Sequence, residues 1–289
     1  MKEIVKEKIA SLLSGDEEIQ SVEQLGGMTN QNYLVKTSSN QYIVKFFGKG
    51  TDKLIDRQNE KFNLELLKDL KLDVENYLFD IEAGIKVNQY IENAETLDSN
   101  TIKTKFEKIA PILQTIHASG KELKGEFAPF EEIKKYESLI QGEISYPNYE
   151  AVRKAVFSLK DQLEEIGIDK KSCHIDLVPE NFIEGPDGHL YLIDWEYSSM
   201  NDPMWDLAAL FLESEFTSAE EEDFLSHYES DKTPVSREKI RIYKILQDII
   251  WSLWTIYKEE NGADFGDYGI SRYNRAVKEL ESEGDLNEN

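Results

Sequence analysis

Residues 174–194 read HIDLVPENFIEGPDGHLYLID in one-letter code, and this stretch decides the fold. Gly185-Pro186-Asp187-Gly188 is a strong turn signal between two short apolar runs, so we expect residues 182–193 to form a β-hairpin. A hairpin brings its open ends together, and these ends are Asn181 and Asp194. One amide oxygen and one carboxylate would then face a common point, which suits a hard cation such as Mg²⁺.

The start of this stretch carries a second pattern. His174, Asp176 and Asn181 fit H-x-D-x-x-x-x-N, which is typical of a kinase catalytic loop. Asp176 can accept a proton from a substrate hydroxyl, and phosphoryl transfer needs such a carboxylate together with metal charge on the phosphates. The alternative is a surface loop and hairpin whose polar residues are caps and solvated turns. The rest of the chain has to decide between the two interpretations.

Composition places the chain among globular proteins. It has 289 residues, of which 40% are hydrophobic and 11% aromatic, enough for one large or two modest domains. It has no apolar run of about 18 residues, so we expect no membrane span. The first eight residues lack the apolar stretch of a signal peptide. The single cysteine, Cys173, excludes an internal disulfide and favours a reducing cytoplasm, with Cys173 as a small buried residue.

The formal charge is −24 at pH 7 and the pI is near 4.6. Nucleic acid is therefore not an expected partner, because phosphate binding requires clustered Lys and Arg. A negative field favours a cationic substrate. Solubility explains most of these carboxylates equally well.

The hydrophobic pattern predicts an α+β protein with two domains, residues 1–92 and 93–289. In the first domain we expect a helix at 3–14, strands at 19–25, 33–36 and 42–47, a helix at 56–70, and strands at 77–81 and 85–91. In the second we expect helices at 103–118, 130–141 and 148–166, one starting after Pro203, and others at 219–229 and 236–259. We expect residues 278–289 to be frayed.

A glycine-rich segment lies between two of the expected strands. Gly26 and Gly27 let the backbone approach a phosphate, and Thr29 and Asn30 supply small polar side chains. The segment is neither a P-loop nor a G-x-G-x-x-G motif. A plain hairpin turn is the alternative.

Lys45 is a charge inside the apolar strand 42–47, and a buried charge requires a partner. In kinases the corresponding lysine holds phosphates and pairs with a helical glutamate. Helix 56–70 offers Glu60 and Glu65, and Glu60 is preferred because it shares the core-facing stripe with Leu64. The alternative is a lysine that protects an edge strand from aggregation.

Two further positions are open to two interpretations. Asp206, in the first turn of the helix after Pro203, is placed to cap that helix or to hold the catalytic loop, and capping is favoured. In helix 236–259, Trp251 and Trp254 share one side, apart from the core row. They are either packing residues or the lining of a partly open cavity that attracts quaternary ammonium groups. The core row comprises Tyr243, Leu246, Ile250, Leu253 and Tyr257.

These motifs together resemble the choline/ethanolamine kinases, in the aminoglycoside-phosphotransferase-like branch of the protein-kinase fold, and the bacterial choline kinases in particular. The resemblance runs from about residue 20 to 260. It rests on the order of five features: Gly26 to Asn30, Lys45, His174 to Asn181, Asp194 to Tyr197, and the pair Trp251 and Trp254.

The resemblance implies a two-lobed fold with a small antiparallel sheet and a larger helical lobe, ATP and Mg²⁺ as cofactors, and choline as the substrate. Asp176 would orient the choline hydroxyl, and Asn181 and Asp194 would hold Mg²⁺. Lys45, paired with Glu60, would contact phosphates under the glycine segment. The remaining implied contacts are Gln89, Tyr90 and Ile91 with adenine, Tyr197, Trp251 and Trp254 with the trimethylammonium group, and Glu196 and Glu213 as nearby negative charges.

Three alternatives stay open. The acceptor could be ethanolamine, or an aminoglycoside, whose several cationic groups would favour scattered carboxylates over an aromatic cage. The chain could also be a pseudokinase that binds nucleotide without turnover. The joint presence of Lys45, Asp176, Asn181 and Asp194 argues against the last.

Overall fold

The structure is a computed structural model that describes residues 2–9, 12–13, 17–27, 30–48, 50–282 and 284–286. The chain forms two compact units. The first unit comprises Met1–Ile112 and Pro179–Ser198, and the second comprises Leu113–Val178 and Ser199–Asn289. The hairpin stretch therefore belongs with the N-terminal segment, although the predicted division at residue 92 assigned it to the other domain. The segments of each unit are grouped by contacts between residues far apart in the sequence, and sequence patterns do not reveal such contacts.

The first unit is built on a five-stranded antiparallel sheet with the order β1-β2-β3-β5-β4. Because β3 is an inner strand, the edge-strand interpretation of Lys45 is wrong. Val35, Val44 and Val87 are fully buried in the hydrophobic core formed by this sheet. The strands are β1 (Ile19–Gln24), β2 (Gln31–Thr37), β3 (Gln41–Phe46), β4 (Asn76–Asp80) and β5 (Ile85–Gln89).

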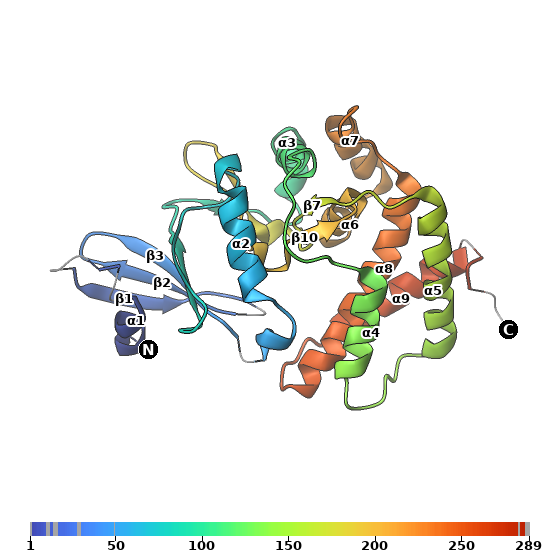
Figure 1. Cartoon of the computed structure of the whole chain (residues 1–289), viewed down its shortest axis with the longest axis horizontal. Helices are drawn as coiled ribbons and strands as arrows, with labels where there is room; N and C mark the ends of the chain where they lie inside the picture. Colours follow the sequence, from blue (N-terminus) through green and yellow to red (C-terminus); the bar gives the residue numbers. More distant parts are fainter. Residues whose placement is uncertain are drawn as a thin grey trace. The chain divides into compact units, whose positions relative to one another are not determined.

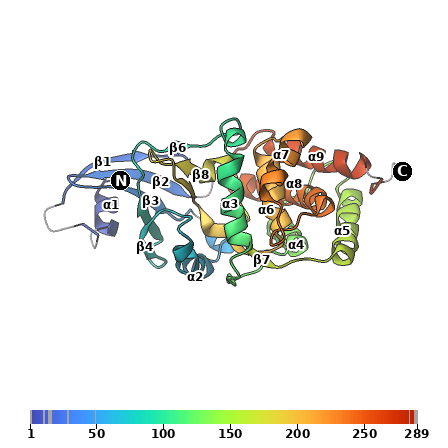
Figure 2. The ribbon, with the colours of Figure 1, turned by 90° about the horizontal axis from the view of Figure 1, so that it is seen from above.

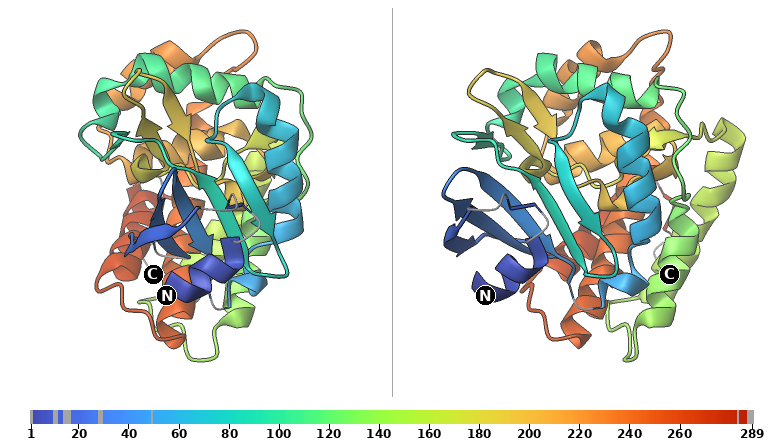
Figure 3. Two further views of the ribbon diagram at one scale, coloured as in Figure 1. Left: turned by 90° about the vertical axis from the view of Figure 1, so that its left-hand side faces the viewer. Right: turned by 60° about the vertical axis from the view of Figure 1, so that its left-hand side comes forward.

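Two helices accompany this sheet. Helix α1 (Lys2–Ile9) buries Val5 and Ile9 against the sheet core. Helix α2 (Arg57–Leu67) runs alongside β4 and β5 (Figures 1 and 3). It begins where the Asp56 carboxylate accepts the backbone N–H groups of Gln58 and Asn59, which satisfies two donors of its first turn. Its predicted range, 56–70, is confirmed together with the 3-10 turn Lys68–Leu70 that follows.

The predicted hairpin at residues 182–193 is confirmed. Strands β8 (Phe182–Glu184) and β9 (Leu190–Leu192) pair antiparallel, and β6 (Glu95–Thr96) adds a third strand to them. Gly188 closes the turn with φ of 79°, a left-handed conformation that suits glycine, and its N–H donates to the Gly185 carbonyl at 2.9 Å.

The second unit is mostly helical, and α8 contacts α4, α6 and α9 (Figures 1 and 2). The predicted core row of α8 is confirmed, since all five of its side chains are buried. The helices are α4 (Pro129–Leu139), α5 (Tyr149–Ile166), α6 (Pro203–Glu213), α7 (Ser218–Tyr228), α8 (Arg237–Glu260) and α9 (Tyr268–Ser282), and α3 (Phe106–His117) crosses the division between the units.

Two features of the second unit lay outside the sequence predictions. Strands β7 (Lys171–Cys173) and β10 (Ser199–Asn201) pair antiparallel at either end of residues 174–198. Helix α9 continues through Ser282, so the prediction that residues 278–289 fray is wrong for 278–282, because Ala276 and Leu280 are buried in the core. In the described part of the chain, no helix combines the length and hydropathy that crossing a bilayer requires.

Candidate active site

The segment predicted to be the catalytic loop, residues 174–181, begins in a strained backbone conformation held by Asp206. Ile175 has φ of 78°, which a β-branched residue rarely adopts. The Asp206 carboxylate accepts the backbone N–H groups of His174 and Ile175, both at 2.8 Å, and the Trp205 indole N–H donates to the Ile175 carbonyl at 3.0 Å. Helix α6 thus fixes the backbone directly before Asp176.

The preferred interpretation of Asp206 as a helix cap is wrong. The cap of α6 is Asp202, whose carboxylate accepts the Met204 N–H at 3.0 Å. Asp206 is instead fully buried and also bonds His117 Nε2 at 3.0 Å, while His117 Nδ1 bonds the Tyr228 hydroxyl at 2.7 Å. This chain of contacts holds the loop of the second unit to α3 and α7.

Asp176 is half-buried in the second unit. Its negative charge acts on the hydroxyl groups of two tyrosines, Tyr136 of α4 and Tyr268 of α9. Burial, and then the charges of Glu213 and Asp176, raise the pKa of Tyr268 to about 12, against a lowering by Arg272. Burial raises the pKa of Tyr136 above its ordinary range, with Asp176 as a smaller cause.

The open end of the hairpin brings Asn181 and Asp194 close in the first unit, as their positions predicted. The Ile193 N–H donates to the Asn181 carbonyl at 2.8 Å. Asp194 has φ of 68°, and its side chain is 27% exposed. A carboxylate and an amide are hard oxygen donors, so this pair of residues fits Mg²⁺ by the chemistry of its donors. The coordination itself stays a prediction.

Lys45 pairs with Asp194, not with Glu60 as predicted. Lys45 Nζ lies 2.6 Å from Asp194 Oδ1. Burial would lower the pKa of Lys45, but the carboxylates of Asp194 and Glu196 outweigh it and the pKa is raised. The ammonium group is therefore charged and bound to the residue expected to hold the metal.

Glu60 forms ion pairs with two other cations. It accepts from Lys86 Nζ at 3.0 Å and from Arg57 Nη1 at 2.6 Å. Lys86 faces Lys45 in the register of β3 and β5, and it is 1% exposed. Lys86, a second buried lysine opposite Lys45, thus forms the ion pair with Glu60 that we predicted for Lys45. The helix pattern alone did not indicate this. Glu60 contributes to the field on Lys45 without a direct contact in the ion pairs described.

Glu196 is also buried in the first unit, within hydrogen-bonding distance of two partners. Its Oε2 lies 2.9 Å from Arg57 Nη1 and 2.7 Å from Asn30 Nδ2. Burial, and then the charge of Asp194, raise the pKa of Glu196 despite the nearby cations Lys45 and Arg57.

The same cluster of charges acts on Asp73. Burial above all, and to a smaller extent the charge of Asp194, raise the pKa of Asp73 to about 7, against a lowering by Lys86, the Val74 N–H and Lys45.

The glycine segment is shaped for close approach by another group. A Cβ atom at Gly27 would lie 2.7 Å from the Asn30 carbonyl oxygen and from Asn32 Nδ2, whereas one at Gly26 would meet no atom of the described residues within 4 Å. Asn32 Nδ2 donates to the Gly26 carbonyl at 2.9 Å and stabilises the turn. Thr29, which we predicted to contact the nucleotide, lies outside the described residues.

The segment predicted to meet adenine starts at the last residue of β5 and continues into the two residues that follow. Gln89, Tyr90 and Ile91 are half-buried. The Gln89 N–H donates to the Glu75 carbonyl at 2.8 Å. A contact with adenine remains a prediction.

The predicted tryptophan pair belongs to a larger aromatic cluster in the second unit. The rings of Trp251 and Trp254 meet edge to face with centroids 6.3 Å apart. Phe265 lies 5.0 Å from Trp254 and 6.4 Å from Tyr268. The ammonium group of Lys258 lies 5.7 Å from the Trp254 centroid, so this indole face already attracts a cation.

Trp254 is 5% exposed, and its buried indole N–H has no hydrogen-bond partner in the part of the chain that the structure describes. Glu213, predicted as a negative charge near the substrate, binds Arg272 Nη1 at 2.5 Å, and the same nitrogen donates to the Tyr268 hydroxyl at 2.8 Å. Tyr197 is half-buried in the 3-10 turn Trp195–Tyr197 of the first unit.

Several residues of these clusters escaped sequence reasoning. Phe265 and Tyr268 flank the start of α9, a helix that we did not predict. Arg57 and Lys86 are ordinary surface residue types by composition, and only their burial reveals them. Lys86 stands at a polar position of strand 85–91, between Ile85 and Val87, so the alternation gave no indication of its burial.

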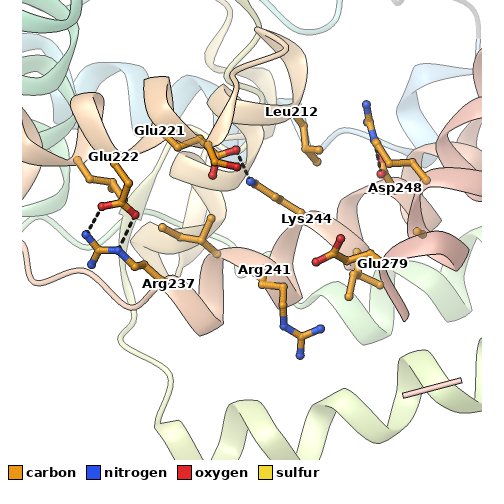
Figure 4. Close-up of a pocket in the computed structure, with 14 residues that line it drawn as sticks. Leu212, Glu221, Glu222, Arg237, Arg241, Lys244, Asp248 and Glu279 are labelled. Atoms are coloured by element: carbon orange, nitrogen blue, oxygen red, sulfur yellow. Dashed lines mark hydrogen bonds and ion pairs between the residues drawn. The ribbon is translucent and has the colours of Figure 1, made fainter. Parts of the chain in front are cut away.

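Two other clusters lie in the second unit. A cavity of about 470 Å³ between α6, α7, α8 and α9 (Figure 4) carries cations that pair with carboxylates, such as Lys244 with Glu221 and Arg237 with Glu222. The ligand atoms of His117, Cys173 and Asp206 lie within 4.8 Å of one another. There, His117 and Asp206 already bond each other, and burial raises the pKa of the Cys173 thiol, which opposes metal binding.

Comparison with known proteins gives one consistent result. A family model described as choline/ethanolamine kinase matches residues 22–277. The crystal structure of choline kinase LicA from Streptococcus pneumoniae has a TM-score of 0.94 and 78% identity, covering 98% of this chain and 99% of that chain. A crystal structure of LicA in complex with AMP has a TM-score of 0.92 and 79% identity, covering 97% of this chain and 98% of that chain.

A curated relative, protein LicA of Haemophilus influenzae, is 32% identical over 269 residues, which are 89% of this chain and 79% of the relative. These matches confirm the predicted α+β, protein-kinase-like fold.

Proposed function

Because the chain belongs to the choline/ethanolamine kinase family, we propose that it transfers the γ-phosphoryl group of ATP to the hydroxyl of choline, giving phosphocholine and ADP. The chain is an enzyme of the phosphotransferase class and binds nucleotide. The solved relative at 78% identity is described as a choline kinase, and this supports choline as the acceptor.

On the acceptor side, Asp176 would accept the proton of the choline hydroxyl as the oxygen attacks phosphorus. The bond between the γ-phosphorus and the bridging oxygen breaks, and ADP leaves with that electron pair. Asp206 would orient Asp176 through the backbone of His174 and Ile175, so that the carboxylate is in position before substrate binds.

On the nucleotide side, Lys45 would neutralise phosphate charge, and the open backbone at Gly26 would cover the phosphates. Asn181 and Asp194 would hold Mg²⁺, which when bound would offset negative charge on the phosphates. Gln89, Tyr90 and Ile91 would contact adenine.

The observation that carries the choice of choline is the aromatic cluster. Each indole or phenyl face contributes about 0.5–2 kcal/mol to binding of a quaternary ammonium group. Trp251, Trp254 and Tyr197 are the predicted contacts, and Phe265 and Tyr268 extend the cluster in the second unit. Glu213 shares its charge with Arg272, which favours an aromatic rather than a carboxylate-based recognition of the cation. We also propose that the enzyme works in the cytoplasm, where the buried thiol of Cys173 stays reduced.

An acceptor series tests this proposal. The full chain is given ATP and MgCl₂ with choline, N,N-dimethylethanolamine, ethanolamine or kanamycin, and ADP release is followed with and without EDTA. We expect kcat/KM to fall with each methyl group removed, and activity to disappear with EDTA. A preference for ethanolamine or kanamycin would overturn the choice of choline as the acceptor. Activity in EDTA would overturn the proposed requirement for Mg²⁺.

A further inference from the structure

Arg57 is buried at the start of α2 and is only 7% exposed, which is uncommon for arginine unless it is paired. Its guanidinium group lies 4.1 Å from the ring centroid of Phe47. Neither the motifs nor the proposed reaction assigns it a role.

Arg57 joins three segments that are far apart in the sequence. Nη1 donates to Glu60 Oε2 at 2.6 Å and to Glu196 Oε2 at 2.9 Å, and Nη2 donates to Asn30 Oδ1 at 3.0 Å. Asn30 Nδ2 donates in turn to Glu196 Oε2 at 2.7 Å. One side chain therefore connects the end of the glycine segment, helix α2 and the turn that follows Asp194.

The charges of this cluster are balanced. The ion pairs of Arg57, Lys45 and Lys86 involve three carboxylates, those of Asp194, Glu60 and Glu196. Lys45 already lies in the field of Glu196 and Glu60 as well as Asp194. Without the charge of Arg57, Glu60 and Glu196 would compete with Asp194 for Lys45, because a buried carboxylate requires a cationic partner.

We propose that Arg57 is a positioning residue for the triphosphate. It neutralises Glu60 and Glu196, so that Lys45 and Asp194 stay in place for the β- and γ-phosphates, and it orients Asn30 at the end of the glycine segment. This inference rests on the proposed function, since it concerns the same nucleotide site.

The test is binding of ATP with Mg²⁺ and of AMP, both by calorimetry, to wild type and to Arg57→Met, which keeps an apolar stem on Phe47. AMP lacks the β- and γ-phosphates, so we expect R57M to weaken ATP binding by about 10- to 100-fold, the size of a lost charged hydrogen bond, and AMP binding much less. In turnover, KM for ATP should rise far more than KM for choline.

A matched control is Arg153→Met. Arg153 stacks on Phe157 at 4.4 Å and binds Glu137 at 2.5 Å, so its loss removes the same kinds of contact in the second unit. It should leave the ratio of ATP to AMP affinity unchanged. The double variant Arg57→Met/Glu196→Gln restores the charge balance and should recover most of the ATP affinity, which a purely structural role of Arg57 would not predict.

Equal weakening of ATP and AMP binding by R57M, or no recovery in the double variant, would overturn the proposal. If R57M does not fold, Arg57→Lys serves instead. A single ammonium group cannot make all three contacts, so the ratio of ATP to AMP affinity should still fall, and an unchanged ratio would refute the proposal. Nucleotide binding does not require phosphoryl transfer, so a failure of choline turnover in wild type would be seen separately.

Discussion

At the scale of single residues, Asp176 carries the chemistry that we propose. Replacing it with alanine removes the group that accepts the choline proton, so kcat should fall by about 10²–10⁴-fold. The side chain is half-buried and its backbone is held by Asp206, so the fold should persist. Steady-state kinetics and circular dichroism measure the two effects. Substantial turnover by a folded D176A variant would remove Asp176 from this role.

Asp73 gives a prediction for stability. Its folded pKa is raised from 3.8 to about 7, mainly by burial. Between these pH values the folded chain keeps a proton that the unfolded chain releases, so the contribution of Asp73 to stability is complete below pH 4 and is lost as pH rises through 7. From pH 4 to 8, Asp73→Asn should gain about 1–3 kcal/mol of unfolding free energy relative to wild type.

Urea unfolding at several pH values measures this difference. The exposed Asp231→Asn serves as the control and should parallel wild type. A constant difference between D73N and wild type across the range would contradict the assignment.

The roles of Asp176, Asn181 and Asp194 stay predictions. That Asn181 and Asp194 lie close together was predictable, because the turn between them indicated a hairpin. The ion-pair partner of Asp194 was not. The pairing of Lys45 with Asp194 rather than Glu60 depends on Lys86 in the neighbouring strand, and strand register is a tertiary property. Burial of Arg57 and Glu196 was hidden for the same reason.

At the scale of elements, the boundaries followed from apolar periodicity for most helices and strands. Helix α9 was missed because its buried stripe includes Gly269 and Arg272, so the apolar periodicity is incomplete in the sequence. It matters for function, since Phe265 precedes it and Tyr268 begins it, next to Trp254 of α8.

Trp254→Ala tests the cluster formed by α8 and the start of α9. Loss of one cation–π face should raise the KM for choline by about 2- to 30-fold, with little change in the KM for ATP. Initial-rate kinetics with each substrate varied in turn measures both constants. Equal changes in the two constants would indicate that Trp254 only packs.

Helix α6 offers a second prediction at this scale. Asp206→Ala leaves the buried N–H groups of His174 and Ile175 without their acceptor, so the unfolding free energy should fall by about 2–5 kcal/mol and kcat should fall as well. Denaturant unfolding and kinetics at a temperature where the variant is folded measure these. A variant with wild-type stability and kcat would show that the backbone of His174 and Ile175 keeps its conformation without Asp206.

At the scale of the whole molecule, the chain forms two units, and each unit combines two segments that are separated in the sequence. The groups proposed for the phosphates and metal belong to the first unit, and Asp176 with the cluster of Trp251, Trp254, Phe265 and Tyr268 belongs to the second. The fold class was predictable because the motifs occur in the order typical of a family. The division into units was not, because the hairpin groups with the N-terminal segment only in three dimensions, through its pairing with β6.

The most direct test of the central claim is a ³¹P NMR spectrum of the full chain incubated with ATP, MgCl₂ and choline. We predict that phosphocholine and ADP appear in equal amounts. Inorganic phosphate in place of phosphocholine, or ATP left intact by a folded sample, would contradict the claim.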